Sequence, residues 1–325
     1  MKNNHHYPNY ISYVGRKQIP SVLLQEYPLP SLDAGEVYYP ENKFLDKYFT
    51  TEKEAQMFGA AEFISFLNDT IDVEHNLVIP AIAGLRRLQF NLPSQPTQEL
   101  FKIATDEAFH AEQSLQFLTA LEKHFGLPGF SNKISPLFLR RLRAQIKDEL
   151  NPLYQQLLPV LNGIVTETRI SIELGQFAKD HSLSESVRTI CRTHAIDEVV
   201  HASQFQALGR WLWDESGENL KDATSRLYVN SAIARSLPDL DTIIISFSRS
   251  TGRSLEDSAR LILSIYNEDI LIDQMFKAAE PTFNFLKSLG IQNFLSIDEE
   301  IEIERTRLYR QIMMRRMQIK SKIKA

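Results

Sequence analysis

Hydrophobic residues recur every three to four positions along most of the chain, which is the spacing of one buried face of a helix. Between residues 51 and 89 the apolar positions follow this period, and Thr51 with Glu54 resembles the capping box that begins a helix. The same reasoning, with Gly126 and Pro128 as stop signals, predicts further helices at about 98–124, 160–179, 184–213, 219–236, 254–288 and 297–322.

Proline and polar clusters mark the connections between these predicted helices. We expect Pro80 to kink the later half of the first helix, and we expect a loop at Asn91–Thr97. A long crossover is expected from about 129 to 160, with a short helical pattern of its own and interruptions at Pro152 and Pro159.

No segment alternates strongly enough to predict a sheet, although Thr242 to Phe247 is rich in β-formers when taken alone. We therefore predict an all-α chain forming a single domain. Its parts are an irregular N-terminal segment (1–50) that wraps the surface, a four-helix core (51–214) and accessory C-terminal helices (215–325).

One motif occurs twice in the predicted core. Glu74 is followed, after thirty-one residues, by Asp-Glu-x-x-His-Ala at 106–111, and Glu167 is followed, after twenty-nine residues, by the same motif at 197–202. About thirty residues complete one helix and reach halfway along an antiparallel partner, so both sets of side chains come to the same height.

The repeat supplies four Glu and two His, which is the ligand set of a dinuclear metal site in a four-helix bundle. Side chains three apart share a helix face, so each Glu-x-x-His pair can serve one metal. His194 lies one turn before Glu198 and can add a nitrogen ligand. The predicted ligands are Glu74, Glu107, His110, Glu167, His194, Glu198 and His201.

Acidic residues next to the predicted ligands have two possible roles, as an alternative ligand or as hydrogen-bond acceptors. Asp72 and His75 lie beside Glu74, so Asp72 stays open as an alternative ligand from the first helix, although Glu74 gives the more regular spacing. Metal-bound imidazoles usually donate their second N–H to a carboxylate, and we expect Asp106 and Asp197 to accept that hydrogen bond from the His of the opposite repeat.

Composition narrows the class of protein. The chain has 325 residues, a net charge of -5 and one cysteine, Cys191. These values give no broad basic surface for nucleic acid and no internal disulfide framework. We expect no membrane span, a cytoplasmic location, a buried thiol at Cys191 and, as the default assembly, a homodimer.

The twice-occurring Glu-x(about 30)-Asp-Glu-x-x-His resembles the soluble di-iron carboxylate oxygenases of the ferritin-like class. His194 in His-x3-Glu-x2-His makes the core, about residues 52 to 214, similar to the p-aminobenzoate N-oxygenase-like di-iron enzymes. The resemblance implies two iron ions, with manganese as mis-metallation, and O2 as co-substrate. It also implies oxidation of a primary amine to a hydroxylamine, nitroso or nitro product, with an external electron donor.

The amine substrate and two other functions stay open. Arg169 and Arg192 are the candidates for holding an acidic substrate, although either could instead be a structural ion-pair partner. A non-acidic arylamine, an amino acid or an amine tethered to a carrier protein all remain possible. The same ligands could also serve oxidation at carbon, or a metal-storage bundle.

Overall fold

The computed structural model describes residues 36–86, 88, 94–130 and 136–324, and these ranges fold into helices joined by short connections, without a strand. The prediction of an all-α chain is confirmed for this part. None of its helices is both long enough and apolar enough to cross a membrane. The first 35 residues of the expected N-terminal wrap lie outside the described ranges.

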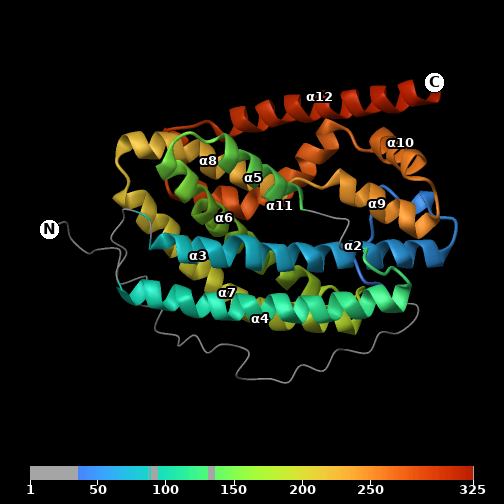
Figure 1. Cartoon of the computed structure of the whole chain (residues 1–325), viewed down its shortest axis with the longest axis horizontal. Helices are drawn as coiled ribbons and strands as arrows, with labels where there is room; N and C mark the ends of the chain where they lie inside the picture. Colours follow the sequence, from blue (N-terminus) through green and yellow to red (C-terminus); the bar gives the residue numbers. More distant parts are fainter. Residues whose placement is uncertain (1–35, 87, 89–93, 131–135, 325) are drawn as a thin grey trace.

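Four long helical segments form the centre of the molecule (Figure 1). The first consists of α2 (Glu52–Val73), the π-helical turn η3 (Glu74–Val78) and α3 (Ile79–Leu85). The others are α4 (Ser94–Phe125), α6 (Pro152–Lys179) and α7 (Glu185–Glu215). The most extensive contacts join α6 with α7 and α2 with α4, while α3 reaches α6 and α4 reaches α7.

Local signals explain where these segments begin and end. The Thr51 hydroxyl accepts a hydrogen bond from the Glu54 amide at 3.2 Å, as the predicted capping box requires. The Ser184 hydroxyl caps α7 through the Val187 amide at the same distance. Gly126 follows α4 with a φ of 64°, a left-handed conformation suited to glycine.

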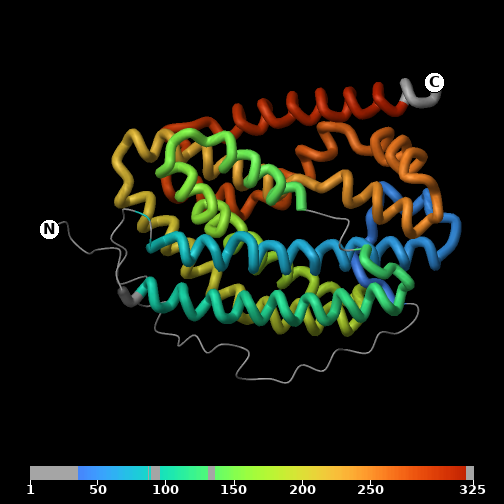
Figure 2. The backbone as a smooth tube through the Cα atoms, viewed as in Figure 1, coloured from blue at the N-terminus to red at the C-terminus, as the bar shows by residue number. Residues whose placement is uncertain are grey.

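The first segment differs from a plain kinked helix. Instead of a break at Pro80, the chain widens into a π turn at Glu74–Val78, where the Ile79 amide bonds the Glu74 carbonyl five residues back. Pro80 then occupies the first turn of α3, where a missing amide is tolerated. Figure 2 shows α2, η3 and α3 continuing along one line.

Two predicted boundaries are corrected. α6 begins at Pro152, eight residues before the expected start at 160, because Asn151 caps it and the helix continues through Pro159. Burial of Leu157, Leu158 and Leu161 beside that proline offsets the one missing hydrogen bond. α4 begins at Ser94, inside the expected loop; residues 89–93 lie outside the described ranges.

The remaining helices cover one side of this centre, with α12 along the outer edge (Figure 1). They are α5 (Leu137–Asp148), α8 (Glu218–Ser236), α9 (Leu240–Thr251), α10 (Leu255–Ile265), α11 (Glu268–Ser288) and α12 (Ile297–Lys324), with single turns η2 (Asp46–Tyr48) and η5 (Ile291–Asn293).

Two of these outer elements differ from the sequence expectation. The β-rich stretch 242–247 lies inside α9, whose buried Ile243, Ile244 and Phe247 share one face, so tertiary packing overrides local β preference. The expected helix 254–288 is two helices, because Asn267 breaks it and caps α11 through the Ile270 amide at 2.9 Å.

Apolar side chains form two buried clusters, one on either side of the motif residues. On α4, the first cluster ends at Ile103 and the second begins at Phe117. On α7, the second cluster ends at Cys191 and the first resumes at Phe205. The Glu and His residues between these positions therefore lie in a zone enclosed by hydrocarbon, where charge is costly unless it is paired or bound to a cation.

Candidate metal centre

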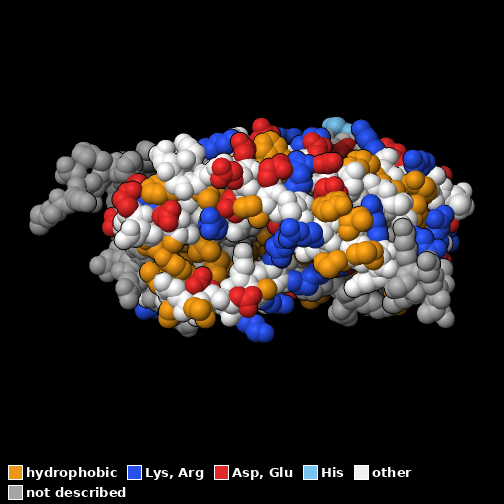
Figure 3. Space-filling model, turned by 90° about the horizontal axis from the view of Figure 1, so that it is seen from above, with side chains coloured by type: hydrophobic (Ala, Val, Ile, Leu, Met, Phe, Trp, Pro, Cys, Tyr) orange, Lys and Arg blue, Asp and Glu red, His pale blue; other side chains and the backbone are white. Residues whose placement is uncertain are grey.

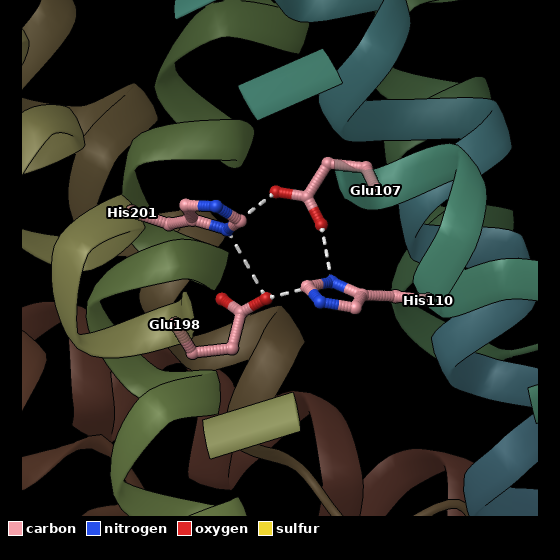
Figure 4. Close-up of side chains that lie close together, drawn as sticks. All are labelled: Glu107, His110, Glu198 and His201. Atoms are coloured by element: carbon pink, nitrogen blue, oxygen red, sulfur yellow. Dashed lines mark hydrogen bonds and ion pairs between the residues drawn. The ribbon is translucent and has the colours of Figure 1, made fainter. Parts of the chain in front are cut away.

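Four motif side chains from α4 and α7 point toward one another (Figure 4). Glu107 and His110 come from α4, and Glu198 and His201 come from α7. All four are at most 1% exposed. The i, i+3 spacing of each pair has produced the facing arrangement expected from the sequence.

Both imidazoles turn the same nitrogen toward the carboxylates. The Nδ1 atom of His110 lies 3.1 Å from Glu107 Oε2 and 3.2 Å from Glu198 Oε1. The Nδ1 atom of His201 lies 2.9 Å from Glu107 Oε1 and 3.2 Å from Glu198 Oε1. Each side chain offers a ligand atom within 4.8 Å of the others, so this cluster can hold a metal ion.

A second, overlapping group extends the cluster toward the π turn. It contains Glu74, Glu107, His194 and Glu198, again with ligand atoms within 4.8 Å of one another. His194 Nε2 lies 3.0 Å from Glu198 Oε1 and 4.0 Å from Glu74 Oε1. The structure therefore brings His194 to the cluster on the same helix face as Glu198, and Glu107 and Glu198 are common to both groups.

Glu74, and not Asp72, faces this cluster. Glu74 is fully buried, whereas Asp72 is partly exposed and accepts a 2.7 Å hydrogen bond from the Asn76 amide group. His75 is exposed. The first-helix position thus falls on the residue favoured by the repeat spacing.

Glu167 on α6 is also fully buried, although it is outside the two groups with the tightest ligand spacing. Both carboxylate oxygens of Glu167, and both of Glu74, lack a hydrogen-bond partner in the described part of the chain. Buried carboxylates without donors are costly in an apolar interior. Four such oxygens beside two imidazoles fit hard divalent cations such as iron or manganese.

Two aspartates hold the outward nitrogens of the imidazoles in a crossed arrangement. Asp197 Oδ2 lies 3.3 Å from His110 Nε2, and Asp106 Oδ2 lies 3.5 Å from His201 Nε2. Each aspartate therefore orients the histidine of the other repeat, as the sequence analysis expected. Such contacts fix the ring so that Nδ1 stays directed at the centre of the cluster.

The four glutamates divide into two electrostatic kinds. Burial raises the pKa of Glu74 and Glu167 well above the ordinary value, and the neighbouring Glu107 and Glu198 raise it further. Burial acts in the same direction on Glu107 and Glu198, but the charge and hydrogen bonds of the histidines outweigh it and lower their pKa. Glu107 and Glu198 are therefore the anionic pair.

The three histidines also differ in the direction of their pKa shifts. Burial alone would lower the pKa of His110 and His201, but their carboxylate neighbours raise it well above the ordinary value. For His194, burial and the adjacent His110 lower the pKa, so this ring stays neutral. The ring centroids of His110 and His194 are 3.9 Å apart. Without metal, protons on two imidazoles supply positive charge that a bound cation would replace.

The two arginines considered for substrate binding have different surroundings. Arg169 is mostly buried; it donates to the Arg235 carbonyl and lies 3.3 Å from Glu173. Arg192 is half exposed and lies 3.7 Å from Glu185. Of these two arginines, Arg169 lines a pocket between α2, α6 and α8, and Arg192 does not. Cys191 is buried, and burial raises the pKa of its thiol.

Several arginines of α12 make contacts within the molecule. Arg315 pairs with Asp241 at 2.9 Å, Arg305 with Asp269, and Arg316 donates to the Leu263 carbonyl. The face on which α12 lies shows acidic and basic side chains interspersed (Figure 3).

Arg235 is a residue near the site that the sequence analysis did not identify. It lies on α8, outside the repeat, and Glu74 is among the charges that act on its guanidinium. Its proximity depends on tertiary packing alone, since no local pattern links residue 235 with residue 74.

Comparison with known protein families found no family that matches the chain, and comparison with curated proteins found no match either.

Proposed function

We propose that this protein is a dinuclear iron oxygenase of the ferritin-like class that oxidises the nitrogen of a primary amine with O2, similar to the p-aminobenzoate N-oxygenase-like enzymes. The observation that carries this proposal is the convergence of Glu74, Glu107, His110, Glu198 and the additional His194 in one buried cluster. A purely structural cluster would not need buried carboxylate oxygens without hydrogen-bond donors.

The residues of the cluster would have different roles in holding the metal ions. Glu107 and Glu198 belong to both ligand groups, so they would hold both metal ions together. Glu167 and Glu74, whose oxygens have no partner among the described residues, would complete the two coordination shells. Asp106 and Asp197 would hold the imidazole rings of His201 and His110 so that Nδ1 faces the metal ions. A pair of ferrous ions held in this way supplies two-electron chemistry with O2.

The surrounding hydrocarbon has a second role in this proposal. Apolar clusters on both sides of the ligands exclude bulk water, which strengthens electrostatic interactions and limits side reactions. The first oxidation converts an amine, O2, two electrons and two protons into a hydroxylamine and water. The two electrons of each turnover come from an external donor.

The test is anaerobic loading with ferrous iron, followed by O2, a reductant and a panel of aryl and aliphatic amines. We expect two irons per chain by elemental analysis and a mass gain of one oxygen on nitrogen. The variant Glu107→Ala should lose both, while Glu112→Gln, an exposed change on the same helix, should lose neither. Oxygen gained on carbon would show the alternative oxidation, and thousands of irons per assembly would show storage. An unchanged amine with two irons bound would contradict N-oxidation.

A further inference from the structure

A pocket of about 320 Å³ lies beside the ligand cluster, between α2, α6, α8 and the start of α9. None of the predicted metal ligands lines it. Its charged lining residues are Glu62, Asp69, Arg169, Glu173, Arg235 and Asp239. The volume suits a small molecule.

The pocket adjoins the ligand cluster on the side of Glu74. Phe66 and Thr70 line the pocket, and Glu74 is the next residue on that face of α2, since the three are spaced by four. Glu74 also acts electrostatically on Arg235 in the pocket wall. A molecule in the pocket would thus lie next to the metal ligands.

Acids outnumber bases in the lining, and part of this charge is already neutralised. Asp239 is 3.3 Å from Arg140 and also caps α9 through the Asp241 amide. Glu173 is 3.3 Å from Arg169. These contacts account for two of the four acids and one of the two arginines.

Glu62 and Asp69 are left without such pairs. Neither has a basic side chain within ion-pair distance in the described part of the chain, and Glu62 Oε1 is buried with no hydrogen-bond partner there. Burial raises the pKa of Glu62 to about 7 and that of Asp69 to about 8. Arg235 lowers the pKa of Asp69, and it also interacts with Glu173 and Glu74.

A pocket lined by the acids Glu62 and Asp69 favours one class of substrate. A cation between Glu62 and Asp69 would favour their ionised forms and displace their protons, whereas an aminobenzoate anion would find Arg169 already engaged with Glu173. An ammonium held by these acids has no free lone pair, so it is not the nitrogen that is oxidised. The substrate must then carry a second amine that extends toward Glu74.

We propose that the pocket selects an aliphatic diamine or diamino acid, with one ammonium held by Glu62 and Asp69 and the other amine presented to the metal cluster. This inference rests on the proposed N-oxygenase function for the fate of the second amine. The binding step depends only on the pocket.

The experiment is isothermal titration calorimetry of the full-length, metal-free protein with 1,5-diaminopentane, ornithine and p-aminobenzoate. We expect at least one of the two cationic amines to bind at least about tenfold more tightly than p-aminobenzoate. Glu62→Gln and Asp69→Asn should each weaken that binding about tenfold, and the exposed control Glu112→Gln should not change it. Circular dichroism and melting temperature would verify that each variant is folded.

Tighter binding of p-aminobenzoate, or equal amine affinity in wild type and both folded variants, would overturn the inference. Amine binding without N-oxidation by the iron-loaded protein would leave the pocket assignment standing and remove the proposed function. N-oxidation of p-aminobenzoate by a protein that binds neither diamine nor ornithine would do the reverse. The two proposals can therefore fail separately.

Discussion

Replacing Glu167 with Gln should stabilise the metal-free protein. Glu167 is fully buried, has no hydrogen-bond donor within the described ranges, and its pKa is raised well above the ordinary value of 4.5. Between the ordinary pKa and the raised one, holding a proton on such a carboxyl costs about 1.4 kcal/mol per pH unit relative to the unfolded chain, which has released it. Gln has nearly the same shape and no proton to hold.

The sign of the pH dependence follows from linkage. Above pH 4.5 the unfolded chain loses the proton that the folded chain keeps, so the stability of the wild-type metal-free protein falls as pH rises toward the raised pKa. Glu167→Gln removes that loss. Its advantage should be near zero at pH 4.5 and should grow by about 1.4 kcal/mol, or roughly 2 °C in melting temperature for a chain of this length, for each pH unit up to the raised pKa.

The assay is calorimetric melting of chelator-treated protein at pH 5 and pH 7, with the exposed Glu112→Gln as control. Adding a divalent metal should reverse the order, because the wild type gains stability from binding and Glu167→Gln gains less. The reasoning fails if Glu167→Gln is no more stable than wild type at pH 7. It also fails if the variant gains as much stability from metal as the wild type does.

Four further substitutions probe the surroundings of the site. His194→Ala should lower iron content from two toward one per chain by elemental analysis, since His194 belongs to only one ligand group; unchanged content would make that ring incidental. Asp106→Asn and Asp197→Asn should each weaken metal affinity about 10- to 100-fold in a chelator competition, because each orients an imidazole; equal affinities would refute this. Asp69→Asn should stabilise the metal-free protein increasingly from pH 5 to pH 8, by at most about 4 kcal/mol, because folded Asp69 keeps its proton up to about pH 8; a constant difference in calorimetric melting would contradict that reasoning.

Sequence spacing alone was sufficient to predict how ligands on the same helix lie relative to one another. The i, i+3 and i+4 spacings placed His110, His194 and His201 correctly with respect to their glutamates, because helix geometry determines those distances. They were insufficient at Pro159 and in α9, where burial against distant helices overrides local preference. The approach of Asp69 on α2 to Arg235 on α8 could not be predicted either, since it depends on how separate helices pack.

The sharing of Glu107 and Glu198 between the two ligand groups has a consequence for how the centre fills. The first cation to arrive would draw both carboxylates into place and displace protons from the imidazoles, which prepares most of the second position at no further cost in ordering. Loading should therefore be cooperative, with chains that hold a single ion scarce even at limiting supply. A partial complement of metal would then exist mainly as a mixture of full and empty molecules.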